Sequence, residues 1–421
     1  MIHVSTATNL YYPVSERKMV RGQGIRLYDA DGNAFIDCAA ATFNLSLGYS
    51  HPEVVEAMKE QAGRLIHVTS SFRTDEVDAL ARNLAFVAPE GLTLVNPKVG
   101  GGSEANEGAI KMAQRATGRS QIITLFRAHV GQTLMMSAMS GNAFRREPFP
   151  VQFPGSLQVP DPYCHRCFYD KNPESCRRFC VDKIEDFIEY ASNGRVAAIL
   201  LEPISGNGGN IVPPDGYLQK LRALCDKHDI MLILDEIQTG IGRTGHMFAA
   251  QHFGIKPDAI TTAKGLGGTG AQVAAIITTE RLGGLPSDQH SFTYGSNVLA
   301  AAAANKTLEI VRQPAFLANV RATGAHILSR LAGMSERFEF VGDVRGVGLM
   351  IGFEIVGEGN APDVARTNAL AQKAMAYGLI LRTSRYGRGN VLKIRPPLIL
   401  TMDEAEEICV RLERLFAAEG V

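Results

Sequence analysis

The sequence predicts an α/β fold in which a large, mostly parallel-sheet domain is joined to a smaller α+β domain built from both ends of the chain. A length of 421 residues exceeds one ordinary hydrophobic core. Between about residues 75 and 290, helical patterns alternate with short apolar runs, which are typical of strands buried on both faces of a parallel sheet. No repeat or long linker interrupts the chain, so we expect the domains to pack together. The predicted large domain spans 56–305, and the small domain combines 1–55 with 306–421.

The N-terminal part is predicted to contain short strands at 24–28 and 34–38, joined by an Asp- and Gly-containing turn. Ser50 and Glu53 have the spacing of a capping box, which predicts that a helix begins there.

The large domain is predicted to alternate strands with helices. The candidate strands are 92–95, 121–126, 197–203, 230–235, 259–262 and 271–278. The candidate helices are 105–116, 182–191, 216–228 and an Ala-rich helix at 298–311. The C-terminal part is predicted to have strands near 348–354, 379–383 and 391–395. Its last helix is expected to begin at a capping box formed by Thr401 and Glu404.

The composition excludes several classes of protein. Lys+Arg and Asp+Glu are both 43, and this balance argues against capture of nucleic acid or of an anionic membrane. The apolar runs are far shorter than the ~20 residues that span a bilayer. The N-terminus lacks the pattern of a secretory leader, and seven cysteines are an odd number that fits reduced thiols. We therefore expect a cytoplasmic protein.

A glycine cluster, 100–102, follows an apolar strand and precedes Ser103 at the start of a predicted helix. Glycines allow close approach of a ligand, and the first N–H groups of a helix bind anions. The alternative is a plain turn with Ser103 as the N-cap. A nucleotide-binding loop of the Walker A type is excluded, because the chain contains no Gly-Lys dipeptide.

Two charged residues are placed at predicted strand ends. Asp235 ends a buried strand, at the edge where open α/β sheets bind ligands, although such a residue also commonly caps a turn. Lys264 lies between an apolar strand and glycines, where burial favours a neutral amine suited to imine formation; a surface loop lysine is the alternative. A phosphate cradle, an acid and a desolvated lysine are together the groups needed to hold pyridoxal 5′-phosphate.

The chain resembles the class III (ω-) aminotransferases of the pyridoxal-phosphate fold type I group over nearly its whole length. The motifs that carry the resemblance are GSEANEGAIK (102–111), LEPI (201–204), DEIQTGIGRTG (235–245), AKGLGG (263–268) and HSFTYGSN (290–297). The resemblance implies fold type I, pyridoxal phosphate as the cofactor, and a homodimer with shared active sites.

The resemblance also implies roles for individual residues. Lys264 would form the Schiff base and later move the proton, Asp235 would pair with the pyridine nitrogen, and Gln238 would bind the ring hydroxyl. Three further positions match residues that hold the phosphate: Gly102, Ser103 and Thr293 of the partner subunit.

Two positions match residues that bind the substrate. Arg395 matches the arginine that grips a substrate carboxylate, with a surface salt bridge as the alternative. Glu202 matches the acid that pairs with this arginine when the substrate has no carboxylate there.

The sequence departs from the family pattern near the cofactor. His129 stands where relatives carry an aromatic residue, so it is expected to stack on the ring, or alternatively to move protons. Gln132 stands where relatives that handle 4-aminobutyrate carry an arginine, which argues against that substrate. The turn at 295–298 differs from the usual Gly-Gly-Asn-Pro, which weakens the match at Thr293.

Four cysteines, Cys164, Cys167, Cys176 and Cys180, have spacings short enough for a zinc site. Their loop resembles one that recurs in this family branch without an obligatory metal. We therefore expect no metal, and reduced thiols near the mouth of the active site.

The leading hypothesis is an aminotransferase that moves an amino group between a primary amine and a 2-oxo acid or aldehyde. The alternative is a pyridoxal-phosphate-dependent epimerase, with His129 or a thiol of the cysteine loop as the second acid. A ligand-sensing protein is disfavoured because Lys264, Asp235 and Arg395 are all retained. The chain is also similar to relatives that act on amino sugars of aminoglycoside pathways, which makes an amino sugar the expected donor.

Overall fold

The computed structural model describes residues 17–148, 153 and 155–419. Residues 1–16, on which the expectation about a secretory leader depends, lie outside the described residues, as does the start of the predicted segment 1–55.

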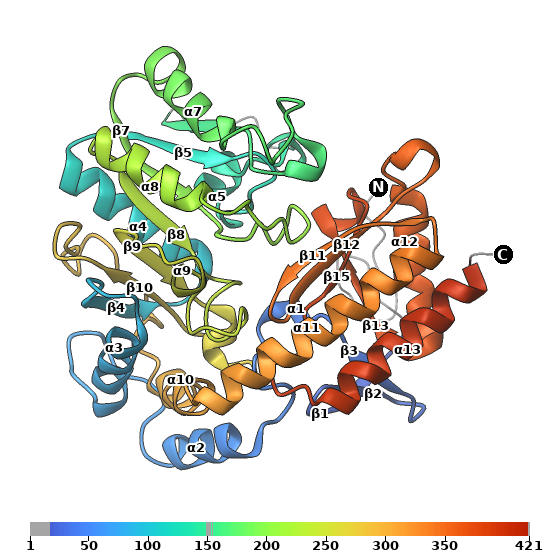
Figure 1. The fold of residues 1–421 in the computed structure, drawn as a ribbon. Helices are drawn as coiled ribbons and strands as arrows, with labels where there is room; N and C mark the ends of the chain where they lie inside the picture. Colours follow the sequence, from blue (N-terminus) through green and yellow to red (C-terminus); the bar gives the residue numbers. More distant parts are fainter. Residues whose placement is uncertain (1–16, 149–152, 154, 420–421) are drawn as a thin grey trace.

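The large sheet has seven strands in the order β4-β10-β9-β8-β7-β5-β6 (Figure 1). The strands are β4 (Leu94–Val99), β5 (Gln121–Leu125), β6 (Ser156–Val159), β7 (Val196–Leu201), β8 (Met231–Asp235), β9 (Ala259–Thr262) and β10 (Ala274–Thr278). Neighbouring strands from β9 to β6 are parallel, and β10 is antiparallel to both of its neighbours. The predicted mostly parallel sheet is confirmed.

Helices cover this sheet. They are α2 (Pro52–Ala62), α3 (Asp75–Val87), α4 (Gly102–Thr117), α5 (Leu134–Met139), α6 (Ala143–Arg146), α7 (Phe179–Asp186), α8 (Tyr217–Lys227), α9 (Ala249–His252) and α10 (Val298–Val311). Helix α4 packs against β7, β9 and β10, whereas α8 packs against β8. A π-helical turn (Phe187–Ala191) extends α7, and a 3₁₀ turn (Cys164–Arg166) lies in the cysteine loop.

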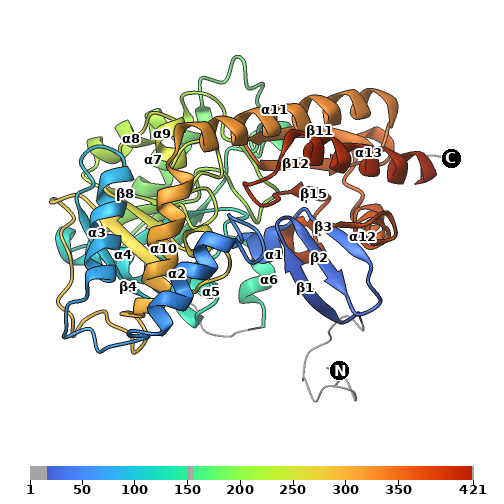
Figure 2. The ribbon, with the colours of Figure 1, turned by 90° about the horizontal axis from the view of Figure 1, so that it is seen from below.

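The small domain joins both ends of the chain. Strands β1 (Met19–Gln23), β2 (Arg26–Asp29) and β3 (Ala34–Asp37) form a sheet in this order, and β13 (Leu379–Ile380) completes it by pairing parallel to β3. A second, antiparallel sheet contains β11 (Val341–Val347), β12 (Met350–Ile355), β14 (Arg382–Thr383) and β15 (Val391–Ile394). The two long helices α11 (Pro314–Arg337) and α13 (Met402–Glu419) lie side by side (Figures 1 and 2). The remaining elements are α1 (Ala40–Phe43), α12 (Val364–Lys373) and the 3₁₀ turns Glu358–Asn360, Ala374–Tyr377 and Ser384–Gly387.

Several predicted elements differ from the structure. The predicted helix near Ser50 and Glu53 is confirmed as α2, with Pro52 in its first turn, but the predicted capping box is wrong. His51 is the N-cap, without a side-chain cap, and Ser50 has a left-handed φ of +53°. The capping box at Thr401 and Glu404 is confirmed, with both backbone N–H groups bonded by the opposite side chain. Strand β4 begins at Leu94 rather than at residue 92, and β1, β6 and α11 were not expected.

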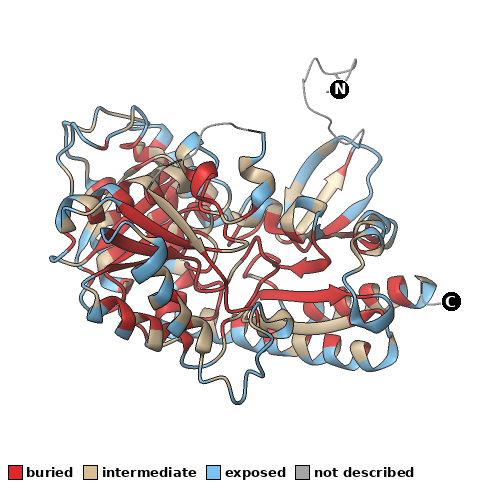
Figure 3. Ribbon diagram, turned by 90° about the horizontal axis from the view of Figure 1, so that it is seen from above, coloured by how far each residue is buried: buried red, intermediate tan, exposed pale blue. Residues whose placement is uncertain are grey.

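The buried apolar residues form two clusters, one around the large sheet and one between α11, α13 and the small-domain sheets (Figure 3). The boundaries at residues 55 and 305 stay a prediction. No helix in the described part of the chain is both long and apolar enough to cross a membrane.

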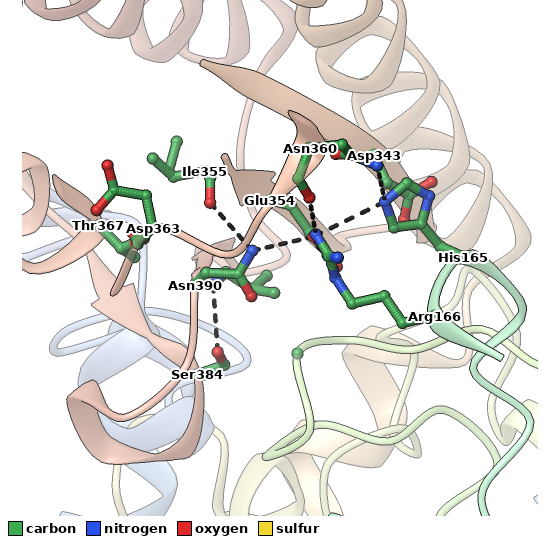
Figure 4. Close-up of polar contacts among 12 residues, drawn as sticks. His165, Arg166, Asp343, Glu354, Ile355, Asn360, Asp363, Thr367, Ser384 and Asn390 are labelled. Carbon is green, nitrogen blue, oxygen red and sulfur yellow. Dashed lines mark hydrogen bonds and ion pairs between the residues drawn. The ribbon is translucent and has the colours of Figure 1, made fainter. Parts of the chain in front are cut away.

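The cysteine loop contacts the small domain through a buried carboxylate (Figure 4). Glu354 on β12 accepts hydrogen bonds from Nε and Nη2 of Arg166, and Nδ2 of Asn390 donates to it over 3.0 Å. Arg166 also donates to the carbonyl of Asn360, at 3.0 Å. This network connects the loop to the strand β15, which begins immediately after Asn390.

Candidate active site

A cavity of about 360 Å³ lies at the carboxyl ends of the parallel strands. Asp235 is the last residue of β8, Glu202 directly follows β7, and Lys264 follows β9 by two positions. Seven of the nine predicted site residues line this cavity: Gly102, Ser103, His129, Glu202, Asp235, Gln238 and Lys264. The sheet therefore brings together residues that are up to 162 positions apart in the sequence, Gly102 and Lys264.

Asp235 is buried and held from two sides. Its Oδ2 accepts a hydrogen bond from Nδ2 of Asn106 at 2.8 Å, and its Oδ1 accepts one from the backbone N–H of Ile237 at 3.0 Å. Oδ1 of Asn106 in turn accepts a hydrogen bond from the Thr261 hydroxyl, at 2.6 Å. Burial raises the pKa of Asp235, while the Asn106 hydrogen bond and the charge of Lys264 oppose this rise. Hydrogen bonds to both oxygens thus orient this carboxylate in the cavity wall.

Lys264 has the properties of an amine that is readily deprotonated. Burial lowers its pKa, and the charge of Arg395 adds to this effect, although Asp235 and Glu202 act in the opposite direction. Among the described residues, no group is hydrogen-bonded to its Nζ. Its φ of +40° is unusual for a residue with a side chain, and such strain is often found at functional positions.

Glu202 lies beside these two residues. It accepts hydrogen bonds from the backbone N–H groups of Gly206, at 2.8 Å, and His129, at 3.3 Å. Burial, followed by the nearby charge of Asp235, raises the pKa of Glu202. The pKa shifts of Glu202 and Lys264 thus both favour the neutral form of the side chain.

The N-terminus of α4 faces the same cavity. Gly102 and Ser103 are its first two residues, and helix N-terminal N–H groups attract anions. A Cβ at Gly102 would lie 2.8 Å from Cδ1 of Ile237, and a Cβ at Gly131 would lie 2.6 Å from Oγ of Ser103. Glycine at both positions keeps this end of the cavity open to a bulky anionic group.

Arg395 does not line the cavity, and the predicted Glu202–Arg395 ion pair is not formed between these described side chains. Arg395 is buried and follows β15; its Nη1 donates to Oε1 of Gln238 over 2.6 Å. Its guanidinium lies 3.2 Å from the ring centroid of Phe43. Nε and Nη2 of Arg395 are buried without a hydrogen-bond partner among the described residues. The arginine therefore reaches the cavity wall through Gln238.

Thr293 is exposed and outside the cavity of its own chain. Its contribution to the site of a partner subunit stays a prediction.

His129 lines the cavity with its ring 6.3 Å from that of Tyr386. Burial lowers the pKa of His129 to about 3, and the positive charges of Lys264, Arg145 and Lys393 contribute. Its Nδ1 is buried without a hydrogen-bond partner among the described residues. The imidazole is therefore neutral at physiological pH, which fits stacking better than proton donation.

Two residues of the site were missed by the sequence reasoning. Asn106 on α4 orients Asp235 through a hydrogen bond. The feature of the sequence that could have identified it is a polar residue among the apolar positions of a predicted helix. Lys393 is buried on β15, two positions before Arg395, with Nζ 5.4 Å from the Phe43 ring centroid. The feature that could have identified Lys393 is a charged residue within an apolar run of the sequence. Burial and the charge of Arg395 lower the pKa of Lys393.

Known proteins match this chain over almost its whole length. The family model "Aminotransferase class-III" matches residues 11–416. The chain belongs to the class-III aminotransferase family. A leucine/methionine racemase of Thermococcus litoralis is 36% identical over 408 residues, which cover 94% of this chain and 90% of the relative.

A related aminotransferase and a solved structure also match this chain over nearly its whole length. An acetylornithine aminotransferase of Methanothermobacter thermautotrophicus is also 36% identical, over 91% of this chain and 90% of its own length. The crystal structure of an amine transaminase from an uncultivated Pseudomonas species, in its pyridoxal-phosphate-bound form, superposes with a TM-score of 0.89 at 30% identity. It covers 96% of this chain and 95% of the solved chain. The fold is therefore that of pyridoxal-phosphate enzymes of fold type I.

This class-III aminotransferase is a pyridoxal-phosphate-dependent enzyme, and its cavity fits the cofactor. The open α4 N-terminus matches the phosphate, the buried Asp235 matches a protonated ring nitrogen, and the unpartnered Lys264 amine matches the aldehyde. Each requirement is met by a different strand or helix end of one sheet edge.

Proposed function

We propose that the protein is an aminotransferase that moves an amino group between a primary amine and a 2-oxo acid or aldehyde. The observation that carries this proposal is the Lys264 amine, which has no hydrogen-bond partner among the described residues and lines the same cavity as two buried carboxylates. An amine in this setting is neutral enough both to attach an aldehyde cofactor and to accept a proton.

Each residue then has one task. The N–H groups of Gly102 and Ser103 bind the cofactor phosphate, helped by Thr293 of the partner subunit in a homodimer. Asp235, oriented by Asn106, holds the proton on the ring nitrogen. The bound cofactor supplies an electron sink for the carbon that carries the amine.

The neutral Nζ of Lys264 would remove the proton from this substrate carbon and would deliver it to a carbon of the cofactor. Glu202 takes up or returns a proton beside it, as its raised pKa allows. Gln238 binds the ring hydroxyl, and Arg395 orients Gln238 and any substrate carboxylate that reaches it.

Lys264→Ala is expected to abolish the visible absorbance of the covalently attached cofactor and all turnover. Borohydride reduction of the wild type, followed by peptide mass spectrometry, should place the cofactor on Lys264. A coloured, active Lys264→Ala enzyme, or an adduct on another lysine such as Lys393, would contradict the assignment.

Racemisation is the second candidate, because the racemase of Thermococcus litoralis is as similar to this chain as the acetylornithine aminotransferase. Incubation with an L-amino acid in heavy water, without an amino acceptor, separates the two reactions. A transaminase converts a stoichiometric amount of donor to its oxo acid, whereas a racemase releases deuterated D-enantiomer over many turnovers without loss of amine.

A further inference from the structure

Three arginines surround one aromatic ring between the two domains. Their Cζ atoms lie near the ring centroid of Phe144, at 5.3 Å for Arg145, 6.0 Å for Arg385 and 4.9 Å for Arg388. Phe144 and Arg145 belong to α6, whereas Arg385 and Arg388 come from the 3₁₀ turn before β15 and the residue that follows it. We call Arg145, Arg385 and Arg388 the arginine cluster.

The cluster has no carboxylate partner among the described residues, since none of its members forms an ion pair. Neighbouring arginines are paired: Arg127 with Asp161, and Arg345 with Asp343. The chain as a whole is balanced at 43 cationic and 43 acidic residues, and the undescribed segments contain only one acidic side chain, Glu16. Asp161, whose charge also acts on Arg385, is already ion-paired with Arg127.

Part of the cluster is also desolvated. Nε and Nη2 of Arg145 are buried and have no hydrogen-bond partner within the described chain. Burial, together with the charges of Arg127 and Arg388, lowers the pKa of Arg385, and the charge of Asp161 only partly opposes this shift. Buried donors without partners are costly, so an arrangement of this kind suits a ligand that supplies the acceptors.

The cluster lies one layer of side chains beyond the cavity. Nη1 of Arg145 donates to Oε1 of Gln132 over 2.8 Å, and its guanidinium stacks on the ring of Tyr386, 4.1 Å from the centroid. The ring of Tyr386 lies 6.3 Å from that of His129, which lines the cavity. Arg145 is also among the charges that lower the pKa of His129.

We propose that the arginine cluster binds a second anionic group, a carboxylate or a phosphate, at the end of the substrate farthest from the reacting amine. Guanidinium groups match both anions with paired N–H donors. This inference rests on the proposed function, because it assumes that the other end of the substrate reacts at Lys264. A polycationic aminoglycoside would be repelled by the cluster, so an amino sugar fits only if it carries an anion.

The test compares substrates that differ only in this group. L-Glutamate against L-glutamine tests a carboxylate, and L-2-amino-4-phosphonobutanoate against L-norvaline tests a phosphate-like group. The holoenzyme is mixed with each compound and the half-reaction is followed by cofactor absorbance. In Arg145→Gln and Arg388→Gln, kcat/KM for the preferred anionic donor should fall about tenfold or more, because charge-assisted hydrogen bonds are lost. The neutral donors should change less than about twofold, and Arg388→Lys should recover part of the loss.

A matched variant and a binding measurement complete the design. Arg337→Gln removes an exposed arginine that is paired with Glu413 at the far end of α11, and it should affect no donor. Calorimetric titration of the holoenzyme with glutarate and with inorganic phosphate should show binding of at least one anion, weakened in the cluster variants. Equal losses for charged and neutral donors, or anion binding unchanged by the variants, would overturn the inference. Absence of a half-reaction with every donor would instead contradict the proposed function, and the calorimetry would still decide the inference.

Discussion

Burial shifts the pKa of the titratable side chains in the cavity, and the partners of their buried atoms can oppose that shift. Asn106 uses both N–H bonds and its carbonyl oxygen, to Val130, Asp235 and Thr261, and so supports a buried carboxylate. Nδ1 of His129 has no hydrogen-bond partner among the described residues, and burial lowers the pKa of this side chain to about 3. Burial is the largest cause of the pKa shift at both His129 and Asp235, and the hydrogen bond from Asn106 opposes that shift at Asp235.

His129 should make the protein less stable in acid. Its folded pKa lies below the ordinary value of 6.5, so the unfolded state binds a proton first as the pH falls. The stability that neutral His129 contributes is present above about pH 6.5 and is lost below it, by roughly 1 kcal/mol between pH 7.5 and 5.5. His129→Phe should lack this part of the loss, as measured by urea unfolding at both pH values. An identical acid loss in wild type and variant would show that His129 is not buried in its neutral form.

Local sequence patterns decide an element only where the backbone permits them. Two stretches carry a capping-box pattern, but Thr401 caps α13 whereas Ser50 has a left-handed φ and leaves the start of α2 uncapped. The two stretches differ in the backbone conformation of the turn before the helix. A four-residue sequence pattern does not specify that conformation.

Thr401→Ala is therefore expected to lower the free energy of unfolding by about 1 kcal/mol, the usual value of an N-cap. Ser50→Ala is the matched control, since Ser50 is exposed and caps nothing, and it should change stability by less than about 0.5 kcal/mol. Urea denaturation of both variants measures the difference, and kcat/KM should stay at the wild-type value. Equal effects of the two substitutions would contradict the assignment of the caps.

The whole molecule is held together at its domain interface by charged groups as well as by apolar packing. Glu354 is fully buried in the small domain, and Arg166 reaches it from the cysteine loop of the large domain (Figure 4). Burial raises the pKa of Glu354, so the carboxylate needs its partners to stay charged. The interface also adjoins β15, which carries Lys393 and is followed directly by Arg395.

Arg166→Ala should cost about 3 kcal/mol of stability, because it leaves a buried carboxylate short of a partner. Arg73→Ala removes an exposed ion pair with Asp78 and should cost less than about 1 kcal/mol. A double-mutant cycle with Glu354→Gln, followed by chemical denaturation, isolates the pairwise contribution. A coupling energy near zero would mean that the Arg166–Glu354 pair does not stabilise the contact between the two domains.

The sequence by itself determined the fold class, the cofactor and most of the cavity wall. Strands that are buried on both faces are continuous apolar runs, and residues at their carboxyl ends, such as Asp235 and Glu202, must meet at one sheet edge. The position of a residue at the end of an apolar run is therefore enough to predict that it lies at this sheet edge.

Only the tertiary structure decided how distant residues combine. It shows Arg395 bonded to Gln238 rather than to Glu202, Asn106 behind Asp235, and Arg145 beside Arg385 and Arg388. These neighbours come from elements that are separated by more than a hundred residues, and their meeting depends on the packing of the two domains. Which side chains contact one another, and which of them are buried, depends on the three-dimensional packing. The order of residues in the sequence does not specify these contacts.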